Sequence, residues 1–348
     1  EDSISEMGKK LMRGLVKNGL SIDYAKRIFE QIQGFSKYGF PESHAASFAI
    51  LAYASCYLKC HYPSEFACSL INSQPMGFYA NHTLIDDAKR HGVEVYPLDP
   101  NTSPWDCPLE KSGVRLWWMV VKGISKFEVE SIMSARPFAN LFDFLGRTRM
   151  RKNILVRLAM GGALEVFGED RRTTLWNILS YHVKKSQSQL DLFSSYHQDT
   201  AETQFADLDL FGEIQEDYMA MSLSHRGHPM GALRSQGALP LMSTAKARSL
   251  PPGSWIRLSG LLLVRQRPST AKGMTFSTLE DEQGFLDLAL KPDVYERYKD
   301  VFLFNCFVTV SGRIQRDGHS VSLLVKKVES LWDDSDNQLN IEPTQYFF

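Results

Sequence analysis

The sequence has no strong excess of either charge and no segment suited to crossing a membrane. Its 348 residues include 39 Lys and Arg against 40 Asp and Glu, which leaves a formal net charge of −1. Such a balance argues against a protein that is basic over its whole surface. The uncharged segment 43–58 is too short and too rich in Ser, Cys and Tyr to span a bilayer, which takes about 20 mostly apolar residues. Because no basic, apolar secretory leader is present, we expect a cytoplasmic protein.

Cysteine is scarce, and its spacing matches no common metal or redox motif. The sequence contains five cysteines and no CxxC pair, the residues being Cys56, Cys60, Cys68, Cys107 and Cys306. Cys56 and Cys60 are one helical turn apart in an apolar segment, so we expect buried thiols there. A zinc site built from Cys56, Cys60, Cys68 and His61 is the less favoured alternative.

The balanced net charge hides blocks of opposite sign along the chain. Residues 145–185 carry nine Lys and Arg against three Asp and Glu, whereas residues 186–220 carry eight acidic residues and no Lys or Arg. Residues 225–330 return to fifteen basic against nine acidic residues. This alternation indicates phosphate-facing modules joined by an acidic linker.

Residues 35–66, FSKYGFPESHAASFAILAYASCYLKCHYPSEF, are the most informative stretch. Ser43 is placed to cap a helix that runs to about His61, and Pro63 ends it. Alternating small and large apolar residues predict a helix packed on most sides, so one interpretation is a core helix. The other is a phosphate site at the helix start, where unpaired N–H groups attract an anion and Ser43 and His44 add donors.

This stretch resembles the fingers segment of the bacterial C-family DNA polymerases, the family of the polymerase III alpha subunit. The sequence Pro-Glu-Ser-His-Ala is most similar to the corresponding segment in the damage-inducible, error-prone branch of that family. The resemblance covers nearly the whole chain and implies that residues 1–110 are the C-terminal part of the fingers and a connector. It also implies that Ser43 and His44 bind an incoming deoxynucleoside triphosphate.

The family's phosphoryl transfer uses two magnesium ions held by carboxylates on a palm sheet. No convincing set of such carboxylates is present in this sequence, so we expect no catalytic residue, no metal ligand and no cofactor in this chain. The chain alone is expected not to polymerise, and Mg²⁺ is expected only for the complete polymerase.

Two glycine-centred helix junctions lie in residues 111–185, and the second follows an arginine-rich helix. A hairpin of this kind brings backbone N–H groups close to a phosphate without reading bases. The pair resembles the family's tandem helix–hairpin–helix domain. The DNA-binding candidates in it are Lys122, Gly123, Ser125, Arg151, Lys152, Gly161, Gly162, Arg171 and Arg172.

Residues 186–215 form a polar, acidic linker with too few apolar residues to fold alone. It contains a glutamine followed by spaced large hydrophobic residues. In an extended peptide such side chains can fill preformed pockets on a partner protein. The peptide resembles the one with which bacterial polymerases hold the beta sliding clamp, and its residues are Gln189, Leu190, Asp191, Leu192 and Phe193. A second segment, 207–211, lacks the leading Gln, so it is at best a weak second clamp peptide. We interpret it as the entry to a helix at 213–224, which leads into the connector 216–250.

Residues 251–332 change to period-two patterning. Five strand candidates (255–268, 273–284, 285–292, 307–318 and 319–328), with a helix at 293–302, fit an OB-fold barrel. Such barrels bind single strands through basic grooves and exposed aromatics. The candidates here are Arg257, Arg265, Arg267, Phe276, Lys291 and Arg313. The acidic tail 333–348 ends in aromatic residues of undecided role.

The sequence therefore predicts a multidomain α+β protein with a helical fingers region, a tandem helix–hairpin–helix domain and a five-stranded OB-fold barrel. We interpret it as the C-terminal region of an error-prone DNA polymerase acting in damage-induced translesion synthesis and DNA repair. Its expected partners are primer-template and single-stranded DNA, the sliding clamp, a nucleotide and other translesion-synthesis proteins, with no membrane. The alternative is a non-catalytic DNA-binding scaffold that recruits clamp and repair proteins.

Overall fold

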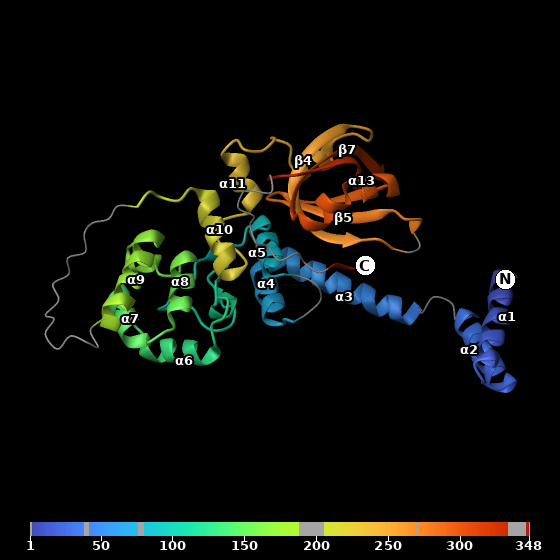
Figure 1. Ribbon diagram of the computed structural model, residues 1–348, viewed down its shortest axis with the longest axis horizontal. Coiled ribbons are helices and arrows are strands. Elements are labelled where there is room, and N and C mark those ends of the chain that lie inside the picture. The colour runs from blue at the N-terminus through green and yellow to red at the C-terminus, as the bar shows by residue number, and fades with distance from the viewer. Residues whose placement is uncertain are drawn as a thin grey trace. The chain divides into compact units, whose positions relative to one another are not determined.

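The computed structural model describes residues 2–37, 42–75, 80–187, 205–268, 271–332 and 346–347 (Figure 1). The chain forms two compact units, Glu1–His61 and Tyr62–Phe348. The clamp-like peptide 189–193 lies outside the described residues, as does most of the acidic tail.

The first unit is entirely helical in its described part. The helices α1 (Asp2–Lys17) and α2 (Ile22–Lys37) pack as a hairpin, and α3 (Glu42–His61) follows. Gly19 takes a positive φ of 87° in the turn, a conformation that glycine adopts without strain. Gly8 leaves room for the ring of Phe29, which a Cβ at this position would meet.

The expectation that α3 is packed on most sides, with buried thiols, is wrong. Its large side chains Phe48, Ile50 and Tyr53 are exposed, and so are Cys56 and Cys60. Apolar residues lie all round the helix, which is the pattern of a buried helix, but within this unit α1 and α2 pack on each other rather than on α3.

The second unit begins with helices and one small sheet around a common core. Its elements before the acidic linker are α4 (Pro63–Asn72), α5 (Asn81–Arg90), β1 (Val95–Tyr96), β2 (Leu109–Glu110), β3 (Gly113–Arg115), η1 (Trp118–Val120), α6 (Lys126–Ala135), α7 (Leu141–Thr148), α8 (Lys152–Met160), η2 (Glu165–Phe167) and α9 (Arg171–Gln187). Trp117, Trp118 and Phe144 are fully buried in this core. Short capped helices around large apolar side chains are what a compact hairpin domain requires.

Three connector helices follow the linker, namely α10 (Leu210–Met221), α11 (Pro229–Ser235) and α12 (Thr244–Ser249). Asp209 caps α10 by accepting a hydrogen bond from the Gly212 amide at 2.7 Å, which matches the interpretation of 207–211 as a helix start. The connector is tied to the barrel by Arg234, whose Nε lies 2.7 Å from Glu282 Oε1.

The C-terminal part of the second unit is a closed barrel. Its elements are β4 (Trp255–Gln266), β5 (Thr275–Asp281), β6 (Gly284–Leu290), α13 (Pro292–Phe304), β7 (Phe307–Asp317) and β8 (Ser320–Ser330). The sheet order is β5-β6-β8-β7-β4, and β5 also pairs with β4, which closes the barrel (Figure 1). The short strand β9 (Tyr346–Phe347) runs parallel to β4.

The barrel follows from alternation along its strands. In β4, Ile256 and Leu258 are buried while Trp255 and Arg257 are exposed, because successive side chains of a strand point to opposite faces. The α13 residues Val294 and Phe302 belong to the same core as the inward side chains of the strands. The predicted order of three strands, a helix and two strands is therefore confirmed.

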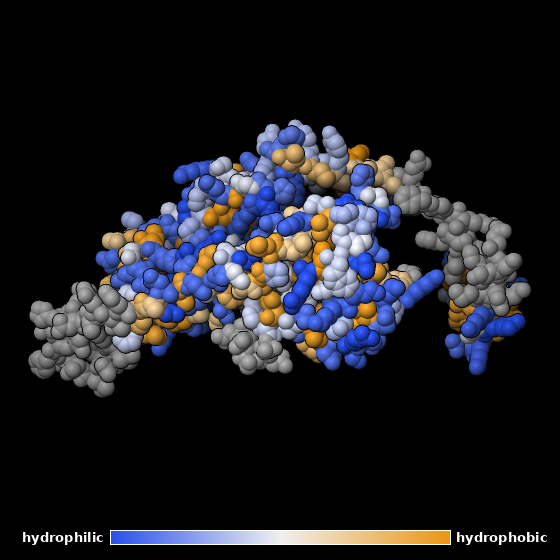
Figure 2. Space-filling view, turned by 90° about the horizontal axis from the view of Figure 1, so that it is seen from above, coloured by the Kyte–Doolittle hydropathy of each residue, from blue (hydrophilic) through white to orange (hydrophobic). Residues whose placement is uncertain are grey.

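Hydrophilic residues cover most of the face seen in Figure 2, with hydrophobic residues scattered among them. Among the helices of the described residues, none combines the length and the hydropathy that a membrane span requires.

Candidate nucleic-acid interface

The outer face of the barrel carries a continuous row of side chains contributed by all its strands. Gln266 on β4 pairs with Phe276 on β5, Phe276 with Ala289 on β6, and Ala289 with Leu324 on β8. Leu324 pairs with Arg313 on β7, and Arg313 pairs with Trp255 at the start of β4. Residues directly opposite one another share a face of the sheet, so these side chains all lie on the outside of the barrel. The row passes round the barrel, since it begins at Gln266 and ends at Trp255 of the same strand.

Two exposed aromatic rings stand on this row. Trp255 is 56% exposed and Phe276 is 40% exposed. The Arg313 guanidinium lies 5.8 Å from the centre of the Trp255 ring, which is cation–π distance. Exposed aromatics beside arginine on a barrel face are the usual features of a surface on which bases stack.

Sequence reasoning found Phe276 and Arg313 but missed Trp255. The signal was present, because Trp255 and Arg257 are at the same outward parity of a strand whose alternate residues, Ile256 and Leu258, are apolar.

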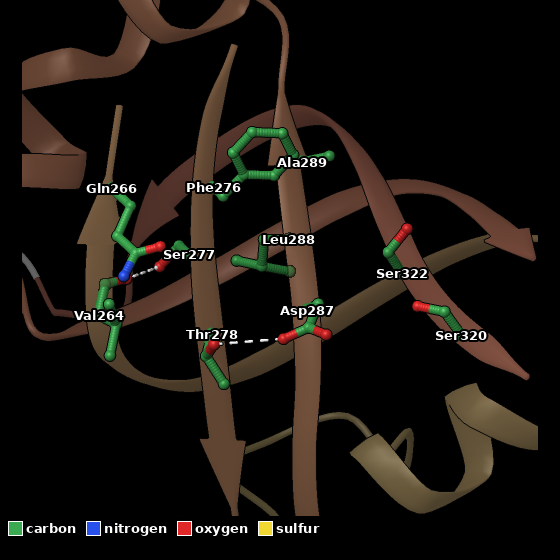
Figure 3. A pocket seen from close by; sticks show the side chains of 10 residues that line it. All are labelled: Val264, Gln266, Phe276, Ser277, Thr278, Asp287, Leu288, Ala289, Ser320 and Ser322. Atoms are coloured by element: carbon green, nitrogen blue, oxygen red, sulfur yellow. Dashed lines mark hydrogen bonds between the residues drawn. The ribbon is translucent and has the colours of Figure 1, made fainter. Parts of the chain in front are cut away.

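A second row beside the first lines a pocket of about 350 Å³ (Figure 3). Val264, Thr278, Asp287 and Ser322 pair across β4, β5, β6 and β8. Thr278 donates a hydrogen bond from its hydroxyl to Asp287 Oδ1 at 3.2 Å. The pocket therefore lies on the same outer face as the aromatic row.

The basic candidates of the barrel differ in how accessible they are. Arg267, Lys291 and Arg257 are exposed, although Arg267 lies 3.4 Å from Glu296 and Arg257 lies 3.5 Å from Glu329. The prediction that Arg265 contacts DNA is wrong. Its side chain is 5% exposed and donates to the carbonyl oxygens of Phe302 at 2.6 Å and Asn305 at 2.8 Å. It points to the barrel interior, and it holds α13 rather than facing a phosphate.

The first glycine hairpin, residues 121–125, is exposed at its tip. Gly123 takes a positive φ of 78°, and Ser125 caps α6 by accepting a hydrogen bond from the Glu128 amide at 3.2 Å. Arg151 joins this tip, since its Nη2 donates to the Gly123 carbonyl at 2.8 Å. The neighbouring Lys152 is also exposed.

An ion pair fixes Arg151 at the first hairpin. Its Nη2 lies 2.7 Å from Glu128 Oε2, and hydrogen bonds from Arg151 and Ser125 lower the pKa of Glu128 to about 2. Lys122 is partly buried and donates to the Tyr218 carbonyl at 3.1 Å, so its ammonium group is directed to α10. The predicted residues that meet at this hairpin are therefore Gly123, Ser125, Arg151 and Lys152.

The second glycine hairpin is buried, which corrects the expectation that it grips a phosphate. The amides of Gly161, Gly162 and Ala163 donate to carbonyls of α8 at 2.8, 3.1 and 2.9 Å. A Cβ on Gly161 would lie 3.1 Å from Met221 Cε and 3.2 Å from Ala220 Cβ, so α10 covers this hairpin. Its N–H groups are thus already used within the chain.

Arg171 holds this covering helix in place, so the prediction that it contacts DNA is also wrong. It is 4% exposed, and its Nη2 lies 2.8 Å from Asp217 Oδ1 on α10. Its Nε donates to Glu165 Oε1, also at 2.8 Å. Arg172 donates to the Ala206 carbonyl at 2.7 Å. Both side chains act within the fold in this structure.

The predicted nucleotide site is described only in part. The His44 side chain is exposed and its ring centre lies 4.4 Å from that of Phe48, while the side chain of Ser43 lies outside the description. No group of three or more His, Cys, Asp or Glu side chains in the described ranges has metal-binding geometry, which leaves the alternative zinc site without support.

Comparison with known proteins assigns both modules. A model described as a helix-hairpin-helix motif matches residues 92–174, and one described as an OB-fold nucleic acid binding domain matches residues 256–331. These matches confirm the predicted fold class. Among solved structures, asparaginyl-tRNA synthetase from Pyrococcus horikoshii is 19% identical over 25% of this chain, with a TM-score of 0.22.

Curated relatives match nearly the whole chain. The error-prone DNA polymerase of Anaeromyxobacter dehalogenans (strain 2CP-C) is 38% identical over 95% of this chain, and error-prone DNA polymerase 2 of Agrobacterium fabrum is 38% identical over the same share. The error-prone DNA polymerase of Bdellovibrio bacteriovorus is 35% identical over 92% of it. The chain spans 30 to 32% of the length of these relatives. The chain belongs to the error-prone DNA polymerase family and corresponds to a C-terminal part of its members.

Proposed function

We propose that this chain is the DNA-holding part of an error-prone DNA polymerase. In this proposal the outer face of the barrel guides the single-stranded template, and the first hairpin, with Arg151 and Lys152, contacts the backbone of the primer-template duplex. The covered second hairpin stabilises the domain instead.

The observation that carries the proposal is the aromatic row of the barrel. Trp255, Phe276 and Arg313 come from three different strands, and the strand register places all three on the outside of the barrel, with Arg313 directly opposite Trp255. If the rings of Trp255 and Phe276 were buried, a role in the hydrophobic core would explain them, but both are exposed. A stacking surface for bases accounts for that exposure.

The complete protein is proposed to act in translesion synthesis and DNA repair, in the cytoplasm. There the primer hydroxyl attacks a deoxynucleoside triphosphate with the help of Mg²⁺ held outside this chain. Ser43 and His44 are proposed to face that nucleotide, and residues 189–193 to bind the sliding clamp.

Replacing both rings in the variant Trp255→Ala/Phe276→Ala should weaken binding of a single-stranded oligonucleotide by about 1–3 kcal/mol per lost stack, the range found for base–aromatic stacking. The measurement is fluorescence anisotropy of a labelled oligothymidine with the full chain. Circular dichroism and thermal melting check that the variant folds.

The matched control is Phe304→Ala, which removes another exposed aromatic ring, one at the end of α13 that does not belong to the paired row. Its affinity should equal that of the parent chain. Equal affinity of the parent and the double variant would show that the row does not bind DNA and would remove the proposed role of the barrel.

A further inference from the structure

We propose that the pocket on the outer face of the barrel, lined by Asp287, holds one base of the bound strand and selects guanine. This inference rests on the proposed single-strand binding by the barrel and extends it from general stacking to base recognition.

The size and position of the pocket fit a single base. Its volume of about 350 Å³ is at the lower end of the range of about 300–1,000 Å³ found for small-ligand sites. In Figure 3 the Phe276 ring lies at one end of the pocket, next to Ala289, and Thr278 and Asp287 lie at the other end, two residues further along their strands. Two residues of a strand span about 7 Å, so a base that stacks on the Phe276 ring can extend its polar edge toward these side chains.

Asp287 is the only side chain with a formal charge among the residues that line the pocket. It is exposed, and the hydrogen bond that Oδ1 accepts from Thr278 at 3.2 Å orients the carboxylate. Ser320 and Ser322 border it on the side of β8 (Figure 3). The other lining residues are uncharged, so the carboxylate decides the electrostatics of the pocket.

A carboxylate here repels a phosphate, so the strand must present a base rather than its backbone to the pocket. The basic residues lie outside it. Arg267 directly follows Gln266 on β4, and Lys291 follows the end of β6, which is the same end of the sheet as Phe276. Arg313 lies across the sheet on β7. Phosphates can therefore follow the rim while a base turns inward.

Guanine is the base whose edge matches a carboxylate. Its N1–H and N2–H groups are adjacent donors, so they can meet both oxygens of Asp287, as an arginine fork does. Cytosine and adenine place a ring nitrogen acceptor beside their amino donor, and thymine flanks its single N–H with carbonyl oxygens. In each of these a lone pair faces the carboxylate, which weakens the contact.

The test compares three labelled nonamers by anisotropy with the full chain: nine thymidines, the same strand with a central guanosine, and the same strand with a central inosine, which lacks the N2 amino group. We expect the guanosine strand to bind about tenfold more tightly than oligothymidine, since hydrogen bonds to charged groups are among the stronger ones. The inosine strand should lose most of that gain.

The variant Asp287→Asn is isosteric and should abolish the guanosine preference while oligothymidine still binds. Asp300→Asn removes the same charge from an exposed position on α13 and should keep the preference. The inosine comparison needs no variant, so a folding defect in Asp287→Asn would not obscure the result.

Each outcome decides the inference. Equal binding of guanosine, inosine and thymidine strands by the parent chain would overturn base selection and leave the proposed single-strand binding intact. A guanosine preference that survives in Asp287→Asn would overturn the assignment to this carboxylate. Failure of the parent chain to bind any of the strands would overturn both this inference and the proposed role of the barrel.

Discussion

Trp255 and Arg265 lie on the same strand, and their neighbours in sequence are similarly apolar and basic. The barrel places Trp255 on the outer row and Arg265 inside, where two carbonyl oxygens accept its hydrogen bonds. The two residues are ten positions apart and would share a face in a regular strand, but the irregularity between Leu262 and Val264 reverses the alternation and turns Arg265 inward. At the residue scale, then, a single bulge decides whether this arginine lies on the outside of the barrel or within the fold. The sequence alone had placed Arg265 among the DNA-binding candidates, because it is one of several basic residues in the barrel.

Glu280 shows the same dependence on environment for a carboxylate. It is fully buried where α5 and α11 meet the barrel, and Arg90 Nη1 lies 3.0 Å from its Oε1. Burial, followed by repulsion from the Asp86 carboxylate, raises the pKa of Glu280 to about 8, although Arg90 opposes this rise. His228 Nε2, 4.0 Å away on the other side, has its pKa lowered to about 4 by burial, so it is neutral there.

A pH titration of stability tests this environment. Below the ordinary pKa of a glutamate, Glu280 is protonated in both the folded and the unfolded chain. As pH rises toward 8, the unfolded chain releases the proton first, so the free energy of unfolding falls until the folded carboxyl also ionises. Glu280→Gln should remove this decline and be more stable than the parent chain at pH 9, on the order of a few kcal/mol.

Urea unfolding at pH 6, 7.5 and 9 measures this, with Glu296→Gln as the control for a solvent-exposed glutamate. Parallel pH profiles for the parent chain and Glu280→Gln would contradict the raised pKa.

At the scale of elements, the two glycine hairpins read alike in sequence and differ in the structure. Gly123 lies at an exposed tip, whereas Gly161 is covered by α10 and Gly162 by the side chain of Arg171. The difference comes from α10, which follows in the chain only after the acidic linker. Contacts of this kind are non-local, and residues 111–185 alone contain no information about them.

Gly162 tests the buried hairpin. Its φ is +68°, and a Cβ there would lie 2.6 Å from Arg171 Nη2. An alanine in left-handed backbone costs about 1–2 kcal/mol. Gly162→Ala should also displace the buried ion pair of Arg171, so the total loss of stability should be about 3 kcal/mol or more. The measurement is the free energy of unfolding in urea.

Gly168→Ala is the matched control, because Gly168 also has a positive φ, +93°, but has no atom within 4 Å of its would-be Cβ. It should lose only the backbone part. Equal destabilisation by the two substitutions would show that the position of Arg171 does not depend on Gly162.

At the scale of the whole molecule, the proposed tether joins DNA binding to the clamp. In this proposal the linker gives the DNA-binding modules a local concentration in the millimolar range, so that weak DNA contacts suffice once the clamp is bound. The acidic composition of residues 186–215 also keeps this linker from competing for DNA, because its charge has the same sign as the phosphates.

Gln189→Ala or Phe193→Ala should weaken binding to a beta sliding clamp by about 2 kcal/mol, the scale of an interface hot spot. In the proposed complex these side chains fill pockets on the clamp, so the loss should appear mainly as faster dissociation in surface plasmon resonance. Leu210→Ala is the control, since α10 holds Leu210 within the folded connector. Unchanged clamp affinity in both peptide variants would rule out the proposed tether.

Much of the fold could be predicted from the sequence, because local patterns carry it. Period-two alternation from residue 255 onward set the barrel strands, and Ser125 and Gly123 marked the first hairpin through capping and turn chemistry. The candidate site was predicted less completely. Phe276, Arg313 and Arg151 were found, Trp255 was missed, and Arg171 and Arg265 were misplaced.

The amino-acid sequence by itself determined the family and the order of modules, because these depend on local composition and on motifs of adjacent residues. Only the tertiary structure decided which aromatic and basic side chains share a surface. Strand register joined Trp255 to Arg313 and Thr278 to Asp287, and the packing of α10 closed the second hairpin. Such contacts join residues far apart in the chain, and their geometry exists only once the chain has folded.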